Sequence, residues 1–197
     1  DKILSEIVSV GASEIIFNGG EPTVYHNLEY AIVRAKELGL KININTNGIS
    51  FANPKYAEKI MEKGIDSFLV SFVSPYEEET DKIRGVKRVL QRSLEGLKNI
   101  RNLSKDVHIK TNTVIVRDSY RNIDRLVDLI GGYVNKIGLS MVDTLKDVDN
   151  SDRRLNADQM AEFYFEILPK IIKKCEEHND VQLTVAPFFM HFINKRL

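Results

Sequence analysis

Residues 14–22 read Glu-Ile-Ile-Phe-Asn-Gly-Gly-Glu-Pro, and this stretch passes from a short apolar run directly into a turn. The apolar run is typical of a buried strand, because it is short, rich in isoleucine and bounded by glycine. Gly19 and Gly20 let the backbone turn and approach a ligand, and Pro22 stiffens the exit. Glu21 offers an acceptor for an ammonium group. Because α/β folds bind ligands where strands end, the stretch predicts a binding site there, although alone it is equally typical of a simple tight turn.

Strand-like and helix-like segments alternate on both sides of this stretch. Apart from an opening helix at 2–10, we expect strands at 14–18, 41–45, 67–72, 107–116, 136–142 and 181–185, and helices at 27–38, 55–63, 89–103, about 123–130 and 157–175. Parallel neighbouring strands require a crossover, which a helix supplies. The alternation therefore predicts an α/β chain with a parallel sheet.

The strands carry polar residues at alternate positions. Asn43 and Asn45 alternate with isoleucines, Ser67 and Ser71 share one face, and the segment 107–112 repeats the pattern. A sheet that is covered by helices on both faces has strands that are apolar throughout. The alternation favours an incomplete parallel (β/α)6-type, TIM-like barrel with a polar lumen. The alternative is a doubly wound sheet whose strands are polar only where they meet loops.

Composition limits the classes of protein that remain. The 197 residues are 43% hydrophobic and 28% charged, which predicts one domain over 1–197. The 28 basic residues balance the 28 acidic ones, so a nucleic-acid or membrane-surface partner is not expected. The chain shows no apolar stretch of the ~20 residues that a spanning helix needs. We expect a cytoplasmic protein.

Three motifs in order carry a family resemblance. They are Phe17-Asn18-Gly19-Gly20-Glu21-Pro22, then Asn45-Thr46-Asn47-Gly48, and finally Ser71 followed by Asp81-Lys82-Ile83-Arg84-Gly85 in what we expect to be a loop. Together they resemble the radical S-adenosylmethionine (SAM) superfamily from about residue 13 to residue 142. The resemblance implies reductive cleavage of SAM at a 4Fe–4S cluster, which yields a 5′-deoxyadenosyl radical that abstracts hydrogen from a substrate.

The resemblance also implies roles for individual residues. Gly19, Gly20 and Glu21 would recognise the amino group of SAM, next to Pro22, Thr46 and Asn47. Ser71 would contact the ribose or carboxylate, and Arg84 would pair with the carboxylate; a surface salt bridge is the alternative for Arg84. Asn112 and Val114 would pack on the ribose and adenine. The implied partners are SAM, an unknown substrate and an electron donor such as flavodoxin or ferredoxin.

The chain departs from the family in its cysteines. The family holds its cluster by three thiolates of a CxxxCxxC loop, whereas the sequence contains a single cysteine, Cys175, at a position typical of a helix core. We therefore expect a fragment, truncated at the N-terminus, that lacks the first barrel strand and the cluster loop and is inactive by itself. No metal ligand and no catalytic side chain is assigned.

Two other functions are compatible with the residues. A cluster-free half-barrel could bind a nucleoside-like ligand as a binding or regulatory domain. A barrel aldolase or hydrolase could use Glu21 as a general base with Lys110 as an electrostatic group, but the sequence shows no convincing second carboxylate or histidine pair. The sequence does not indicate the substrate.

Overall fold

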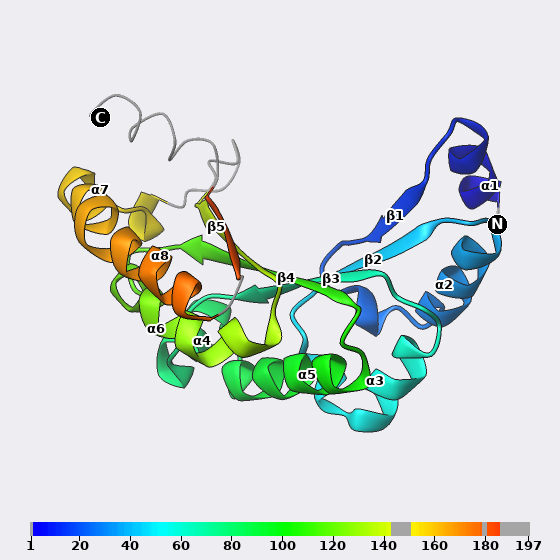
Figure 1. The fold of residues 1–197 in the computed structure, drawn as a ribbon, viewed down its shortest axis with the longest axis horizontal. Helices are drawn as coiled ribbons and strands as arrows, with labels where there is room; N and C mark the ends of the chain where they lie inside the picture. The colour runs from blue at the N-terminus through cyan, green and yellow to red at the C-terminus, as the bar shows by residue number, and fades with distance from the viewer. Residues whose placement is uncertain (1, 143–150, 179–180, 186–197) are drawn as a thin grey trace. The chain divides into compact units, whose positions relative to one another are not determined.

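The computed structural model describes residues 2–142, 151–178 and 181–185. Within them, six strands form one sheet in the order β1-β2-β3-β4-β5-β6 (Figure 1). The strands are β1 (Glu14–Phe17), β2 (Lys41–Thr46), β3 (Ser67–Phe72), β4 (His108–Ile115), β5 (Lys136–Met141) and β6 (Gln182–Val185). Strand β2 is parallel to β1 and β3, and β5 is parallel to β6. The predicted α/β fold with parallel strands is confirmed.

One helix precedes β1, and the others occupy the segments between the strands. They are α1 (Lys2–Ser9), α2 (Leu28–Glu37), α3 (Pro54–Met61), α4 (Glu77–Arg84), α5 (Val89–Leu103), α6 (Ile123–Ile130), α7 (Ala157–Glu162) and α8 (Leu168–Glu177). Short 3-10 turns accompany them: η1 (Pro22–Val24), η2 (Ile49–Ala52), η3 (Tyr120–Asn122), η4 (Gly131–Tyr133) and η5 (Ser151–Arg153). Each expected helix is present, and the structure differs from the expectation at two places.

The first difference is α4, which occupies a segment that we expected to be a loop. The helix has three glutamates in its first turn and Lys82 and Arg84 in its last, which suits the helix dipole at both ends. It ends at Gly85, whose φ of 70° is the left-handed conformation that favours glycine. Just before it, the Ser74 hydroxyl accepts a hydrogen bond from the N–H of Tyr76 at 3.1 Å. Charge and capping, not an apolar stripe, define this helix.

The second difference is a π-helical segment, η6 (Phe163–Ile167), between α7 and α8. The sequence predicts one continuous helix over 157–175. Pro169 lies in the first turn of α8 and has no N–H to donate to a carbonyl one turn earlier. The π-helical pattern, in which each hydrogen bond spans five residues instead of four, accommodates this loss just before the proline.

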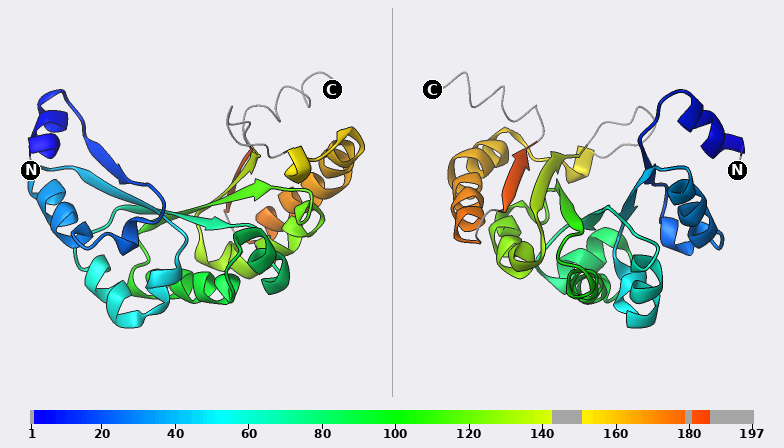
Figure 2. Two further views of the ribbon diagram at one scale, coloured as in Figure 1. Left: turned by 180° about the vertical axis from the view of Figure 1, so that it is seen from behind. Right: turned by 45° about the vertical axis from the view of Figure 1, so that its right-hand side comes forward.

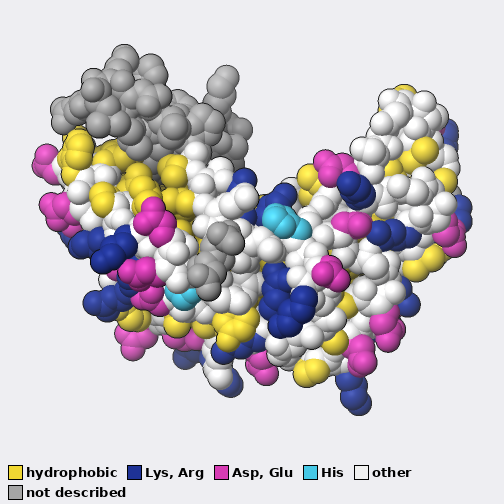
Figure 3. Space-filling view, in the orientation of Figure 1, with side chains coloured by type: hydrophobic (Ala, Val, Ile, Leu, Met, Phe, Trp, Pro, Cys, Tyr) yellow, Lys and Arg dark blue, Asp and Glu magenta, His cyan; other side chains and the backbone are white. Residues whose placement is uncertain are grey.

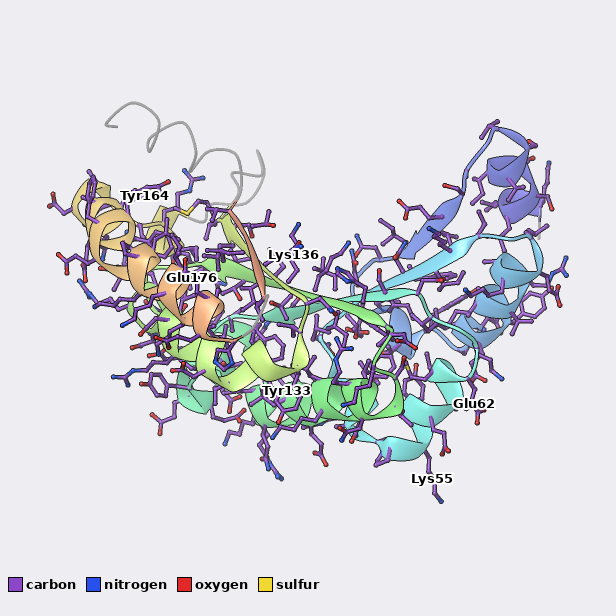
Figure 4. The ribbon with its side chains drawn as sticks, in the orientation of Figure 1. Lys55, Glu62, Tyr133, Lys136, Tyr164 and Glu176 are labelled. Carbon is purple, nitrogen blue, oxygen red and sulfur yellow. The ribbon has the colours of Figure 1, made fainter. Side chains whose placement is uncertain are left out.

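The described chain divides into two compact units, the first formed by residues 1–71 and 91–110 and the second by 72–90 and 111–197. In the first unit, α2, α3 and α5 lie on the same side of β1, β2 and β3 (Figures 1 and 2). Lys55 and Glu62, near the two ends of α3, point away from the sheet (Figure 4), whereas Ala57 and Ile60 of this helix are buried. The fully buried core of this unit includes Ile32, Ile42, Ile44, Phe51, Phe68 and Leu97.

In the second unit, α8 packs against α6, and β6 lies beside β5 (Figure 1). The fully buried side chains here include Tyr120, Ile130, Phe163 and Ile171. Burying a large apolar side chain contributes about 1.5–3 kcal/mol, so this small cluster anchors the helices on the strands. The prediction of one domain over 1–197 stays a prediction.

Burial alternates along the strands as the sequence indicates. On β2, Ile42, Ile44 and Thr46 are buried, whereas Asn43 and Asn45 are only half-buried. Strand β3 repeats this pattern, and on β4 the residues at 109, 111, 113 and 115 are buried while those between them are not. Strands β2, β3 and β4 thus have one buried face and one less buried face, as expected for strands that line a lumen.

The lengths of the helices and the charges on the surface agree with what the amino-acid composition predicts. In the described part of the chain, every helix is too short or too polar to cross a membrane. On the face in Figure 3, acidic and basic side chains are interspersed. The equal numbers of the two charges in the sequence are therefore mixed on this surface.

Two buried hydroxyl groups on β4 lead to a stability prediction. The hydroxyls of Thr111 and Thr113 lie on the covered face, and neither has a hydrogen-bond partner. Replacing Thr113 by valine keeps the shape and removes the unpaired polar group. We expect Thr113→Val to raise the free energy of unfolding by about 1 kcal/mol, measured by urea denaturation of the full-length protein. As a control, Thr80→Val should be destabilising, because the Thr80 hydroxyl donates to the carbonyl of Ser74 at 3.3 Å. Loss of stability in Thr113→Val would contradict this account.

A charged cluster links η3 to the end of α7. Glu162 accepts hydrogen bonds from the hydroxyl of Tyr120 at 2.6 Å and from Arg121 at 2.6 and 2.7 Å. The Arg121 contacts, followed by the Tyr120 hydroxyl, lower the pKa of Glu162 to about 2. Burial, with the adjacent carboxylate, raises the pKa of Tyr120 to about 12, so its hydroxyl stays a donor.

This cluster predicts a specific dependence on acid. Since the pKa of Glu162 is lower in the folded chain than its ordinary value of 4.5, the cluster stabilises the fold above that value. The stabilisation is lost as the pH falls toward about 2. We expect Glu162→Gln to destabilise the protein at neutral pH, with the difference from wild type shrinking as the pH falls below 4.5, in urea denaturation at several pH values. A difference that does not change with pH would contradict the assignment.

Candidate functional site

The turn after β1 presents its backbone openly. Gly19 has a backbone φ of 144°, which residues with a Cβ rarely adopt. Both Gly19 and Gly20 are exposed. A Cβ built on either glycine would meet nothing within 4 Å. The peptide groups of this turn can therefore be approached by a ligand.

Glu21 fastens this turn to the end of β2. Its Oε1 accepts hydrogen bonds from the N–H and the hydroxyl of Thr23, at 3.2 and 2.7 Å, and from the Thr46 hydroxyl at 2.8 Å. Its Oε2 accepts from the N–H of Asn47 at 2.7 Å. A carboxylate has about four acceptor positions, so these four donors nearly saturate it. Glu21 is above all a clamp between two loops, with only the Oε2 side less occupied.

Thr23 and its neighbours extend the cluster. The Thr23 hydroxyl shares a hydrogen bond with that of Ser50 at 2.8 Å, and the Tyr56 hydroxyl donates to the carbonyl of Thr23 at 3.3 Å. Burial, then the charge of Glu21, raises the pKa of Tyr56 to about 12, so it stays a neutral donor. The buried Pro22 begins η1 and fixes the direction of the chain. Thr23, Ser50 and Tyr56 were not predicted from the sequence, because partners 27 and 33 residues apart leave no local pattern.

The Asn47-Gly48 segment forms its own tight turn. The Asn47 Oδ1 accepts from the N–H of Ile49 at 2.9 Å, and the Thr46 hydroxyl accepts from the N–H of Gly48 at 3.0 Å. Gly48 has a φ of 80°, in the left-handed region. In register, Phe17 of β1 pairs with Ile44 of β2, so both loops leave the same edge of the sheet.

The other residues predicted to bind SAM lie on β3, α4 and β4. Ser71 is half-buried on β3, one residue beyond Val70, which is in register with Thr46. Arg84 is the exposed last residue of α4. On β4, the side-chain oxygen of Asn112 accepts from the Ser140 hydroxyl at 3.2 Å, and Val114 is half-buried. The structure thus brings Gly19, Gly20, Glu21, Pro22, Thr46 and Asn47 together within the first unit, whereas Arg84, Asn112 and Val114 belong to the second.

Asp81, which belongs to the third motif, has a structural role at the start of α5. Asp81 accepts from the N–H groups of Arg88 and Val89, at 3.1 and 3.3 Å, and Glu77 accepts from the N–H of Leu90 at 3.0 Å. Two carboxylates of α4 therefore cap the start of α5. Arg88 adopts a φ of 62°, and these hydrogen bonds hold the backbone on either side of it.

Cys175 is unsuited to hold a metal. It is 4% exposed, and burial raises the pKa of its thiol to about 11, so the thiol stays protonated. Among residues 2–142, 151–178 and 181–185, no group of three or more His, Cys, Asp or Glu side chains is arranged to bind a metal ion. The ligands of an iron–sulfur cluster are therefore not found in the described part of this chain.

The fold and the site define a class: parallel α/β proteins with a glycine turn and a clamped carboxylate at the carboxyl ends of adjacent strands. Residues 1–130 match the family model of the radical SAM superfamily, and the chain belongs to that superfamily. The family resemblance drawn from the three motifs is confirmed.

Two curated relatives show the extent of the similarity. The chain is 30% identical over 128 residues to an Fe-coproporphyrin III synthase of Methanosarcina barkeri, which covers 65% of this chain and 31% of that protein. It is 26% identical over 163 residues to an AdoMet-dependent heme synthase of Nitratidesulfovibrio vulgaris, which covers 81% of this chain and 43% of that one. The chain thus spans less than half the length of these relatives.

A solved structure shows the same fold. Streptococcus suis SuiB bound to S-adenosylmethionine superposes with a TM-score of 0.73 at 17% identity, over 94% of this chain and 42% of SuiB. At this identity the similarity concerns the fold alone.

The network around Glu21 makes a testable prediction. Glutamine at this position has one acceptor oxygen, and its NH₂ group would face donors that now bind the carboxylate. We expect Glu21→Gln to lower the free energy of unfolding by about 2 kcal/mol and to speed hydrogen exchange at the amide of Asn47. Glu58→Gln, at an exposed position of α3, is the matched control and should change stability by less than about 0.5 kcal/mol. Equal stability of both variants would show that Glu21 is not a clamp.

Proposed function

We propose that this chain is the catalytic core of an enzyme that binds SAM and cleaves it reductively to a 5′-deoxyadenosyl radical, which takes hydrogen from a substrate. The single observation that carries the proposal is the Glu21 cluster, in which the turns of the two family motifs are hydrogen-bonded to each other in a radical SAM chain. We further propose that residues 1–197 act as one catalytic domain.

The residues present fit SAM at its amino end. An ammonium group needs acceptors, and the open turn offers the carbonyl groups of Gly19 and Gly20 beside the less occupied Oε2 of Glu21. Thr46 and Asn47 would hold this arrangement from β2. Ser71 and Arg84 would bind the ribose and the carboxylate, a task that suits the planar donors of arginine, and Asn112 and Val114 would contact the ribose and adenine.

The whole protein would need a cluster and an electron. When bound, a 4Fe–4S cluster supplies the electron that cleaves SAM, and its ligands would come from residues other than those described here. The residues of this chain would orient SAM and exclude water from its reacting carbon. An electron donor such as flavodoxin or ferredoxin and a cytoplasmic location are part of the proposal.

The test uses the full-length protein, purified and reconstituted without oxygen. We expect a bound 4Fe–4S cluster, tight binding of SAM, and formation of 5′-deoxyadenosine and methionine on addition of a reductant. A protein that binds SAM or a nucleoside but contains no iron would instead support a cluster-free binding domain. Absence of both iron and SAM binding would contradict the proposal.

The residue assignments are tested in the same protein. We expect Arg84→Ala to weaken SAM binding by about tenfold or more, because a charge-assisted contact is lost. Lys87→Ala is the matched control, since it removes an exposed cation three residues further along. If Arg84→Ala and Lys87→Ala bind SAM equally well, Arg84 is not a ligand of the SAM carboxylate.

A further inference from the structure

Helix α5 contacts the Asn47–Asn53 turn through two polar side chains. The Ser93 hydroxyl donates to the carbonyl of Asn47 at 2.7 Å. Six residues later, the Asn99 side chain donates to the carbonyl of Phe51 at 2.9 Å and to that of Ala52 at 3.3 Å. Ser93 is 1% exposed. The face of α5 that carries Ser93 and Asn99 therefore holds this loop by hydrogen bonds.

Gly96 lies between these two contacts and lets the loop approach the helix closely. A Cβ on Gly96 would lie 2.1 Å from the carbonyl oxygen of Gly48 and 3.2 Å from the amide nitrogen of Ala52. Glycine inside a helix costs about 1 kcal/mol relative to alanine. The direct contact between backbones explains why glycine is used here.

The contact continues to the open glycine turn through a single residue. Asn47 donates its N–H to Glu21 and accepts from Ser93 through its carbonyl, so it is held on both sides. Glu21 in turn directly follows Gly19 and Gly20. These bonds form a continuous connection from the interior of α5 to the site for the amino group.

We infer that Ser93 and Gly96 are positioning residues: α5 is the support that sets the place of the Asn47 turn and, through Glu21, of the acceptors for the amino end of SAM. The inference rests on the proposed function, because it takes SAM as the ligand of this turn. It adds an element that lies outside the three sequence motifs. The residues proposed to contact the nucleoside end, Asn112 and Val114, lie on β4 and outside this support.

The experiment measures ligand affinity by equilibrium dialysis with the full-length, reconstituted protein. Two probes are used: SAM itself, and 5′-methylthioadenosine, which keeps the nucleoside and lacks the amino-acid end. We expect Ser93→Ala to weaken SAM binding by about threefold to tenfold, as for loss of one hydrogen bond. Gly96→Ala should weaken it more, by about tenfold or beyond, since the Gly48 carbonyl must move. The affinity for 5′-methylthioadenosine should change by less than about twofold in both variants.

Two controls separate positioning from general loss of stability. Asn102→Ala removes an exposed side chain from the same helix and should change neither affinity. Ile100→Val removes one buried methylene from α5 but leaves the Ser93 and Asn47 contact in place, so it should lower stability and keep SAM affinity. Hydrogen exchange of the Asn47–Ser50 amides should speed up in Ser93→Ala and not in Ile100→Val.

The outcomes are distinguishable from one another. If wild type binds SAM and Ser93→Ala binds it equally well, the support role is refuted while the proposed function stands. Equal weakening of both probes would show general damage to the fold and would also refute the role. If wild type binds no SAM, the proposed function fails, and the inference fails with it. Should Gly96→Ala fail to fold, Ser93→Ala still decides.

Discussion

The candidate site depends on one half-buried carboxylate. Glu21 receives four hydrogen bonds from three residues, and the two from Thr46 and Asn47 join segments 25 and 26 residues apart in the chain. Without this acceptor, the N–H of Asn47 and the hydroxyl of Thr46 would lose their partner in a place that is poorly accessible to water. The position of the open glycine turn relative to β2 therefore follows from a single side chain. Its carboxylate is engaged by groups of the chain itself.

The sheet supports this arrangement by dividing its two faces. Isoleucine and phenylalanine side chains fill the face under the helices, whereas asparagine and serine occupy the other face of β2 and β3. Apolar burial holds the strands in register, and because β1 and β2 are in parallel register, both loops leave at one edge. The helices thus stabilise the scaffold from one side and leave the polar side available for a ligand.

Local sequence patterns were sufficient to predict most helices and strands. They failed where charged side chains or a proline determine the secondary structure. The apolar spacing of α2, α5 and α6 and the alternation in β2 predicted those elements, because burial of one face imposes a period on the sequence. Helix α4 has almost no apolar side chain, so its capping and its charges left no such period. The π-helical segment was missed for a different reason: a proline near the start of α8 changes the hydrogen bonding without interrupting the apolar pattern.

The sequence by itself determined the fold class, the family and the identity of the turn residues. These features depend on residues that are close together in the chain, as apolar periodicity and short motifs are. Only the tertiary structure decided what those residues do to one another. It showed Glu21 as a clamp, Asp81 as a cap for α5, and Ser93 and Gly96 as contacts of the Asn47 turn. The physical reason is that hydrogen bonds and close backbone contacts form in space, and hydrogen-bond partners 7 to 46 residues apart leave no periodic pattern in the chain.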